Sequence, residues 1–355
     1  MPVVGTLDLK AGEWIEVRSE SEILATLADD GTLDGLPCMP EMLAHCGQRF
    51  QVYKRADKTC DTVNWTGLRR MDDTVHLSML RCNGMAHGGC QAGCLMFWKE
   101  AWLRRSPPVD SVSRAADGTE SFSTNGTAAD STNGTDARRV DPTVRIRAWL
   151  ETTVLRNPST AIEICYRCQA TELLKASCPL RWWEPKQYVR DVRMNKLSLA
   201  EVARGLVFAA YSKVLRKLTG RPFPDVRGAL KRTPSESLGL QSGEWVIIKS
   251  KEEILATLDT SGRNRGMTFD SEMLPYCGRR YRVLRRVERI IDETTGRLIE
   301  PAGVSIILED VICMSRYRRS CPRSVYPFWR EIWLRRASAS ETPENAASHA
   351  AEARL

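Results

Sequence analysis

The chain contains one sequence pattern twice, and the two copies align without a gap. Residues 12–105 and 243–336 correspond at one fixed offset, 243 − 12 = 231. The closest matches are GEWIEVRSESEILATL with GEWVIIKSKEEILATL, EMLAHCGQRFQV with EMLPYCGRRYRV, and FWKEAWLRR with FWREIWLRR. A repeat of this kind predicts that both copies fold to one plan. We call residues 12–105 the N-terminal segment and residues 243–336 the C-terminal segment.

Each segment has the pattern of a strand, a short helical region and several more strands. The opening EWIEVR or EWVIIK is rich in β-branched and aromatic residues, as strands are. A Ser-x-x-Glu capping box then predicts a helix start, at Ser19 with Glu22 and at Ser250 with Glu253. A second helical turn ends at a glycine, and alternating apolar and polar residues predict the later strands. Four or five strands in each segment predict a small, partly open β-barrel, with the paired tryptophans in its core rather than in a ligand-stacking platform.

This order of elements, with the motif E-M-L-x-x-C-G-[QR]-R-[FY]-x-V, resembles the SH3-like barrels of the Mind-bomb type. The resemblance covers about half of each segment and implies an SH3-like fold. Cysteine-rich insertions depart from the family pattern, so the ligand-binding role of those barrels is not carried over. The whole chain also resembles a set of uncharacterised bacterial proteins with the same repeat and a central CQATEL segment, which implies no activity.

The predicted fold class is therefore α+β, with two duplicated small SH3-like β-barrel modules flanking a helical middle. The first module, residues 1–105, carries a Cys/His metal site. A disordered linker, residues 106–140, follows because this stretch is poor in large apolar residues and carries STNGT twice. The helical middle is expected at residues 141–230, the second module at 231–337 and a disordered tail at 338–355.

The clearest helix of the middle is LAEVARGLVFAAYSKVLRKL. Ser198 and Glu201 form a capping box before it, and Gly220 follows its basic end. Its apolar stripe is expected to pack in the core.

A dense group of metal-ligand residues lies in the N-terminal segment. Cys82, His87, Cys90 and Cys94 have the spacing C-x4-H-x2-C-x3-C and are separated by glycines. Glycine permits positive φ, so the backbone could wrap tightly round an ion held in a tetrahedral Cys3His shell. Such a shell suits Zn²⁺, but thiolates also hold iron–sulfur clusters, and C-N-G-M-A-H resembles the C-D-G-S-H motif of small iron–sulfur proteins. The plainer alternative is that small buried cysteines pack a tight turn.

Two further cysteines are candidate ligands. Cys165 and Cys168 form a C-x2-C half-site in CYRCQATELLKASC, and Cys168 is expected to add a ligand unless both thiols simply share the buried face of a helix. Cys60 is a candidate fifth ligand or a core replacement, because Ile291 is its counterpart in the C-terminal segment.

The C-terminal segment repeats only half of the ligand group. One hypothesis is a self-contained N-terminal site, and we prefer it because a site built across two modules demands exact packing. The other is a shared site, completed by C-terminal cysteines across a pseudo-twofold axis. At the fixed offset Cys82 and Cys90 match Cys313 and Cys321, whereas His87 and Cys94 match Arg318 and Val325.

Composition and motifs narrow the function. No signal peptide and no run of 18 apolar residues is seen, which predicts a cytoplasmic protein without membrane contact, so the 12 cysteines are expected as thiols or ligands. The net charge of +8 is dispersed and no nucleic-acid-binding motif accompanies it, which argues against nucleic acid. No catalytic motif is present. The leading hypothesis is a metal-binding accessory protein that binds a partner protein or small ligand. The alternative is a redox enzyme of a biosynthetic pathway, holding an iron–sulfur cluster or a single metal.

Overall fold

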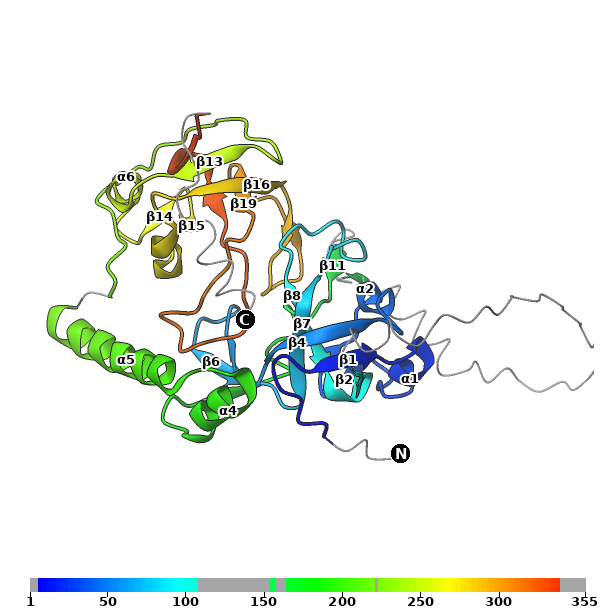
Figure 1. Ribbon diagram of the computed structural model, residues 1–355. Coiled ribbons are helices and arrows are strands. Elements are labelled where there is room, and N and C mark those ends of the chain that lie inside the picture. Colours follow the sequence, from blue (N-terminus) through cyan, green and yellow to red (C-terminus); the bar gives the residue numbers. More distant parts are fainter. Residues whose placement is uncertain (1–5, 108–153, 157–163, 221–222, 339–355) are drawn as a thin grey trace, which may run out of the picture.

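The computed structural model describes residues 6–107, 154–156, 164–220 and 223–338 (Figure 1). Short helices and antiparallel sheets make up this part of the chain, in agreement with the α+β prediction. Most of the predicted linker, nearly all of the predicted tail and the first part of the predicted helical middle lie outside the described residues. None of the described helices is long and apolar enough to cross a bilayer.

Each segment contains one five-stranded antiparallel sheet, and strands at the same offset occupy the same places in the two sheets. The N-terminal order is β8 (Leu95–Lys99), β7 (Thr74–Arg81), β4 (Arg49–Arg55), β1 (Trp14–Val17) and β9 (Leu103–Arg105). The C-terminal order is β20 (Trp329–Arg330), β19 (Ser305–Leu308), β16 (Arg280–Val287), β13 (Trp245–Ile248) and β21 (Leu334–Arg336). Even the irregularity in pairing recurs, between Val52 and Lys54 in β4 and between Val283 and Arg285 in β16.

Short elements connect the strands. The predicted capping boxes are present at the first helices, where Ser19 and Ser250 accept from the backbone N–H of Glu22 and Glu253. The helices are α1 (Glu20–Leu24) and α6 (Lys251–Leu255), then α2 (Pro40–Leu43) and η3 (Ser271–Tyr276), and η1 (Glu100–Trp102) and η4 (Glu331–Trp333). The short strands are β2 (Thr32–Leu33), β3 (Leu36–Pro37), β5 (Thr59–Cys60), β6 (Leu68–Arg70), β14 (Arg263–Asn264), β15 (Met267–Thr268), β17 (Ile290–Ile291) and β18 (Leu298–Ile299).

Each sheet covers its own apolar core, and two tryptophans without exposed surface lie in each core. They are Trp98, Trp102, Trp329 and Trp333. The indole Nε1 of Trp102 donates to Oγ1 of Thr26 at 2.9 Å, and Trp333 makes the matching bond to Thr257 at 3.0 Å. The expectation that these aromatics belong to the core is confirmed.

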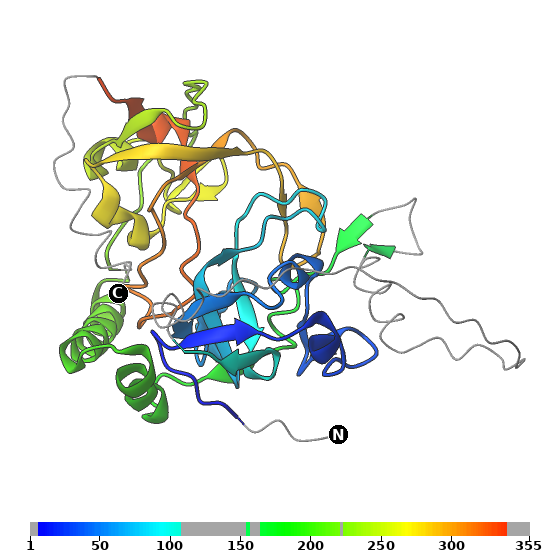
Figure 2. The same ribbon diagram turned by 45° about the vertical axis from the view of Figure 1, so that its right-hand side comes forward.

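The middle of the chain is only partly helical. Two helices, α4 (Lys186–Asn195) and α5 (Leu199–Thr219), lie along one side of the molecule (Figures 1 and 2). The prediction of a continuous helical middle is wrong in the strands β10 (Val154–Arg156), β11 (Ile164–Tyr166) and β12 (Cys178–Leu180). These strands complete small sheets, because β12 pairs with β6 of the N-terminal segment and β10 pairs with β11.

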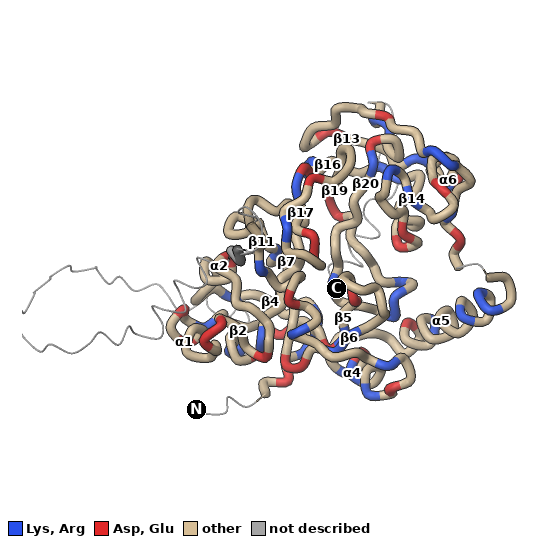
Figure 3. The backbone as a smooth tube through the Cα atoms, turned by 180° about the vertical axis from the view of Figure 1, so that it is seen from behind, with Lys and Arg blue, Asp and Glu red and all other residues tan. Residues whose placement is uncertain are grey.

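Helix α5 begins after Ser198 and ends before Gly220, as its capping signals predict. Its apolar stripe is not part of a core, however, since none of its residues is buried and Val207, Val214 and Leu218 are exposed. The expectation of core packing is therefore wrong for this helix. Seen from behind, Lys and Arg interleave with Asp and Glu along the chain, which agrees with dispersed charge (Figure 3).

The two segments meet through reciprocal contacts. The backbone N–H of Cys60 in β5 donates to Sγ of Cys321 at 3.1 Å, and the N–H of Ile291 in β17 donates to Sγ of Cys90 at 3.4 Å. At the offset of 231, Cys60 corresponds to Ile291 and Cys90 corresponds to Cys321. The two segments therefore pack as two copies related by a twofold axis do. A hydrogen bond between the counterparts Thr62 and Glu293 fits a position on the pseudo-twofold axis.

His76 in β7 is a fully buried titratable group. Its Nδ1 lies 2.9 Å from the carbonyl oxygen of Met96, and its ring lies tilted against that of Phe97 at a centroid distance of 4.5 Å. Burial lowers the pKa of His76 to about 3. Its counterpart in the C-terminal segment is Ile307, which is equally buried.

We predict that His76→Ile reduces the acid sensitivity of the fold. The unfolded imidazole titrates near 6.5, so protonation favours the unfolded chain as the pH falls from about 6.5 towards 3. At pH 5 this effect costs the wild type about 2 kcal/mol. Between pH 7.5 and pH 5, the free energy of unfolding measured with urea should therefore fall by about 2 kcal/mol less in the variant than in the wild type. Equal losses in the two proteins would contradict burial of a neutral imidazole.

Candidate metal centre

A tight loop, residues 82–94, carries most of the predicted ligands between β7 and β8. The loop is closed at its base by a hydrogen bond from the N–H of Cys82 to the carbonyl oxygen of Cys94, at 2.8 Å. Gly84 has a φ of 72°, and a Cβ built on it would lie 1.9 Å from the carbonyl oxygen of Cys90. The expectation that glycines allow this backbone to wrap tightly is confirmed.

The C-terminal segment has the same loop without the glycines. The N–H of Cys313 donates to the carbonyl oxygen of Val325 at 2.8 Å. Positive φ angles occur at the counterparts of Gly84, Gly88, Gly89 and Gly93, which are Ser315, Arg319, Ser320 and Ser324. Positive φ is sterically unfavourable for residues other than glycine, so the surrounding structure must impose this conformation.

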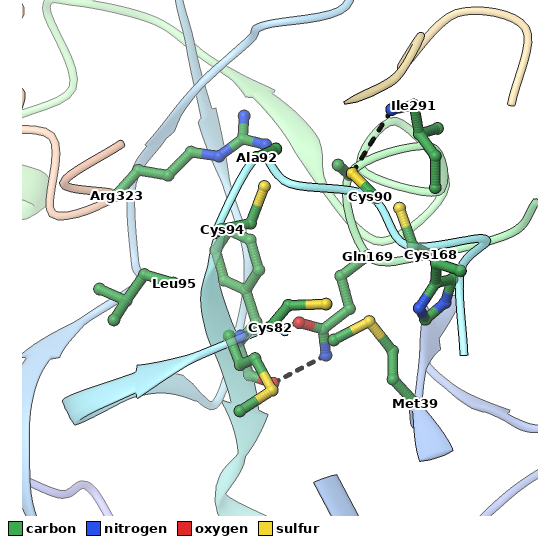
Figure 4. A pocket seen from close by; sticks show the side chains of 15 residues that line it. Met39, Cys82, Cys90, Ala92, Cys94, Leu95, Cys168, Gln169, Ile291 and Arg323 are labelled. Carbon is green, nitrogen blue, oxygen red and sulfur yellow. Dashed lines mark hydrogen bonds between the residues drawn. The ribbon is translucent and has the colours of Figure 1, made fainter. Parts of the chain in front are cut away.

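Four cysteines surround one cavity beside the N-terminal loop. Figure 4 shows Cys82, Cys90, Cys94 and Cys168 around a common space. The cavity has a volume of about 30 Å³, which is enough for a water-sized occupant. The structure therefore brings together four of the six predicted ligands through their thiols, three from the N-terminal segment and one from the middle.

Gln169 fixes the position of Cys168. Its Oε1 accepts from the N–H of Phe97 in β8 at 2.8 Å, and its Nε2 donates to the carbonyl oxygens of Phe97 and Pro37 at 2.9 and 3.1 Å. Leu173, a few residues later, is buried in the N-terminal core. The CQATEL sequence is therefore docked on the N-terminal sheet. Cys168 follows strand β11 and lies on no helix, so the structure does not support the alternative in which Cys165 and Cys168 share the buried face of a helix.

His87 borders the same cavity, but both of its ring nitrogens have other partners. Nδ1 lies 2.7 Å from Oε1 of Glu41, and Nε2 lies 3.1 Å from the carbonyl oxygen of Arg167. A carboxylate and a carbonyl both accept hydrogen bonds, so each ring nitrogen faces a hydrogen-bond acceptor. In this arrangement His87 anchors the loop, and both of its ring nitrogens are engaged by partners other than the cavity thiols.

Glu41 is the functional residue that the sequence analysis missed. Its carboxylate also accepts from the N–H of Ala86 at 3.1 Å. Burial opposes its ionisation, but the hydrogen bond and charge of His87 outweigh burial and lower the pKa of Glu41. Its counterpart Glu272 accepts from the N–H of Tyr317, the counterpart of Ala86, at 2.7 Å. The sequence did hold a signal for Glu41, because the glutamate of the EML motif occurs in both segments.

Cys82 belongs to two possible sets of metal ligands, the four thiols of the cavity and a group with Glu41 and His87. Among the described residues, the only three donors whose atoms all lie within 4.8 Å of one another are Glu41, Cys82 and His87. The four thiols of the cavity are therefore more widely spaced. Zinc–sulfur bonds of about 2.3 Å would set the sulfur atoms about 3.8 Å apart in a tetrahedron.

Burial makes three of the four cavity thiols weaker acids. It raises the pKa of Cys94 to about 12 and that of Cys168 to about 11, and it raises the pKa of Cys82 well above its ordinary value. These thiols are therefore protonated near neutral pH when no cation is bound. A metal ion would have to displace their protons, since only thiolates are good ligands.

The C-terminal segment completes the wall of the cavity without supplying a thiol. Ile291 and Arg323 line it, and the N–H of Ile291 contacts Cys90. The preferred hypothesis of a self-contained N-terminal site stays a prediction, and the wall residues that the C-terminal segment adds to the cavity carry no thiol. Cys321 does not complete the cavity as the rival hypothesis requires, since it packs against Cys60 instead.

Cys60, a predicted ligand, is not among the residues that line the cavity. It forms a small buried cluster with Leu68, Leu180 and Cys321. Comparison with known proteins adds no assignment, because no family model, curated protein or solved structure matches the chain.

We predict strong energetic coupling between Glu41 and His87. A buried hydrogen bond to a charged group contributes about 1.5–3 kcal/mol, so a double-mutant cycle with Glu41→Gln and His87→Gln should give a coupling of that size. Urea unfolding of the metal-free protein measures it. The matched control is the pair Glu272 and Arg318, where coupling should be smaller because Arg318 donates to Asp270. No coupling between Glu41 and His87 would show that the pair does not hold the loop.

Proposed function

We propose that the protein is a metal-binding accessory protein whose centre is held by Cys82, Cys90, Cys94 and Cys168. The observation that carries this proposal is the convergence of four thiols, from two distant parts of the sequence, on one cavity. Four protein ligands leave no open position for a substrate, which favours a structural centre over a catalytic one. The bound metal would join the middle of the chain to the N-terminal loop.

Zinc is the first candidate for the metal. A closed shell of four thiolates suits Zn²⁺, and the small cavity suits a single ion. The thiols would have to move closer together on binding, and the glycines of the loop make such movement inexpensive. The pair of His87 and Glu41 would hold the loop from outside the thiol set.

An iron–sulfur cluster is the second candidate, and the wide spacing of the thiols favours it. Four cysteine thiolates are the usual ligands of such clusters. A cluster has its own inorganic sulfur, so its protein sulfurs need not approach one another as closely as around one zinc ion. With this centre the protein would transfer electrons, which is the basis of the alternative redox-enzyme hypothesis.

We further propose that the two segments are copies of one SH3-like module. Matching strand orders, matching pairing irregularities and matching loop backbones support a common origin. A partner protein or a small ligand is the proposed target of these modules.

We predict that substitution of a cysteine that lines the cavity lowers the metal content, whereas substitution of other cysteines does not. Cys90→Ala and Cys168→Ala should lower the metal content of the purified protein several-fold, because each removes one of four ligands. Cys321→Ala changes the counterpart of Cys90 and should keep its metal, at a packing cost of about 1–2 kcal/mol. Cys178→Ala, at an exposed thiol, is the second control.

Elemental analysis and an absorption spectrum of anaerobically purified protein measure these outcomes. One zinc per chain without colour supports the structural centre, whereas iron, sulfide and a brown colour support the cluster. Equal loss of metal from the Cys90 and Cys321 variants would contradict the thiol set. Wild-type protein without any tightly bound metal would contradict the proposed function itself.

A further inference from the structure

A second pair of thiols lies at the contact between the two segments, outside the metal cavity. Cys60 lies in β5 of the N-terminal segment, and Cys321 lies in the C-terminal loop, 261 positions away in the sequence. Their side chains are hydrogen-bonded to each other within the apolar cluster that includes Leu68 and Leu180. Cys60 and Cys321 have exposed fractions of only 5% and 4%.

The surroundings of this pair differ from those of an ordinary core cysteine. Sγ of Cys321 accepts backbone N–H groups from Cys60, at 3.1 Å, and from Arg323. The buried guanidinium of Arg323 is close by, with its Nη1 3.3 Å from the carbonyl oxygen of Cys60. Several donors and a positive charge therefore converge on one sulfur, an environment that stabilises a thiolate.

The two thiols are also unequal as acids. Burial is the largest influence and opposes ionisation of Cys321, but the hydrogen bonds from the Cys60 thiol and from the backbone N–H groups of Arg323 and Cys60 together outweigh it and lower the pKa of Cys321 to about 7. The hydrogen bond between the two thiols, followed by burial, raises the pKa of Cys60. One sulfur is therefore suited to attack, and its neighbour holds a proton.

The pseudo-twofold relation provides an internal comparison. At the matching contact, Sγ of Cys90 accepts the backbone N–H of Ile291. Ile291 is the counterpart of Cys60, so this contact has an isoleucine where the other has a cysteine. The fold thus presents a backbone donor to a sulfur at both contacts, and at the contact between Cys60 and Cys321 the residue that donates the N–H carries a thiol itself. Packing alone requires no cysteine there, because isoleucine fills the position in the other segment.

We propose that Cys60 and Cys321 are a redox site that forms a disulfide between the two segments when the protein meets a hydroperoxide. The thiolate of Cys321 attacks hydrogen peroxide, so that an S–O bond forms, the O–O bond breaks and one water leaves. The sulfur of Cys60 then attacks the resulting sulfenic acid. The S–S bond forms, the S–O bond breaks and a second water leaves. The two thiols together lose two electrons and two protons, and the peroxide is reduced to two waters.

Full-length, metal-bound protein tests this proposal. It is treated with hydrogen peroxide at rising doses until the exposed Cys178 is oxidised, then alkylated in denaturant, digested and analysed by mass spectrometry. We expect a linked peptide of Cys60 and Cys321 at doses below the one that oxidises Cys178, with two alkylatable thiols lost per chain at those doses and both restored by dithiothreitol. If both thiols are still alkylated when Cys178 has reacted, or if either is linked to another cysteine, the proposal is wrong.

Two variants and one control complete the test. Cys60→Ser and Cys321→Ser should each abolish the linked peptide, and Cys60→Ser should leave a sulfenic acid on Cys321 that a dimedone probe traps. Cys60→Ile, which copies the other segment, replaces Cys60→Ser if the serine variant does not fold. Cys313→Ser, at a nearby thiol of the same loop, should still form the link. Loss of the link in Cys313→Ser would show that another pair carries the chemistry. Because the readout is a peptide mass, failure here leaves the metal proposal untouched.

Discussion

The packing of each cysteine loop against a short strand of the other segment is the constraint on which the rest of the structure depends. A backbone N–H of β17 meets Cys90, and a backbone N–H of β5 meets Cys321. These reciprocal bonds fix both loops, so one small interface positions the thiol cavity and the thiol pair together. Arg323 connects the two places, since it lines the cavity and also contacts Cys60.

The sequence predicted much of this structure because its strongest signals are local or repeated. Capping boxes located α1, α5 and α6, and the fixed offset predicted matching strands in the two segments. The spacing of Cys82, Cys90 and Cys94 indicated that their thiols lie around one space, because these residues share one loop. The exposed face of α5 was not predictable, since an apolar stripe does not reveal whether another element covers it.

The sequence analysis did not identify contacts between distant residues. His87 stays a predicted ligand, and its Nδ1 pairs with a carboxylate 46 positions earlier in the sequence. Cys60 was predicted as a candidate fifth ligand or a core residue, and it packs against Cys321 of the other segment. Periodicity and spacing describe what neighbouring residues share, whereas these pairings are set by how the segments pack. The sequence identified Cys168 as a candidate ligand but did not predict where it lies, because Gln169 holds this part of the chain against the N-terminal sheet.

The central claim is that four thiols, rather than the nearby set of Glu41, Cys82 and His87, bind the metal. X-ray absorption at the metal edge of the purified protein distinguishes the two sets most directly, because sulfur scatters differently from nitrogen and oxygen and lies further from the metal. The account predicts a first shell of sulfur alone, with four sulfurs around zinc. A shell with one sulfur and several nitrogen or oxygen neighbours would contradict it.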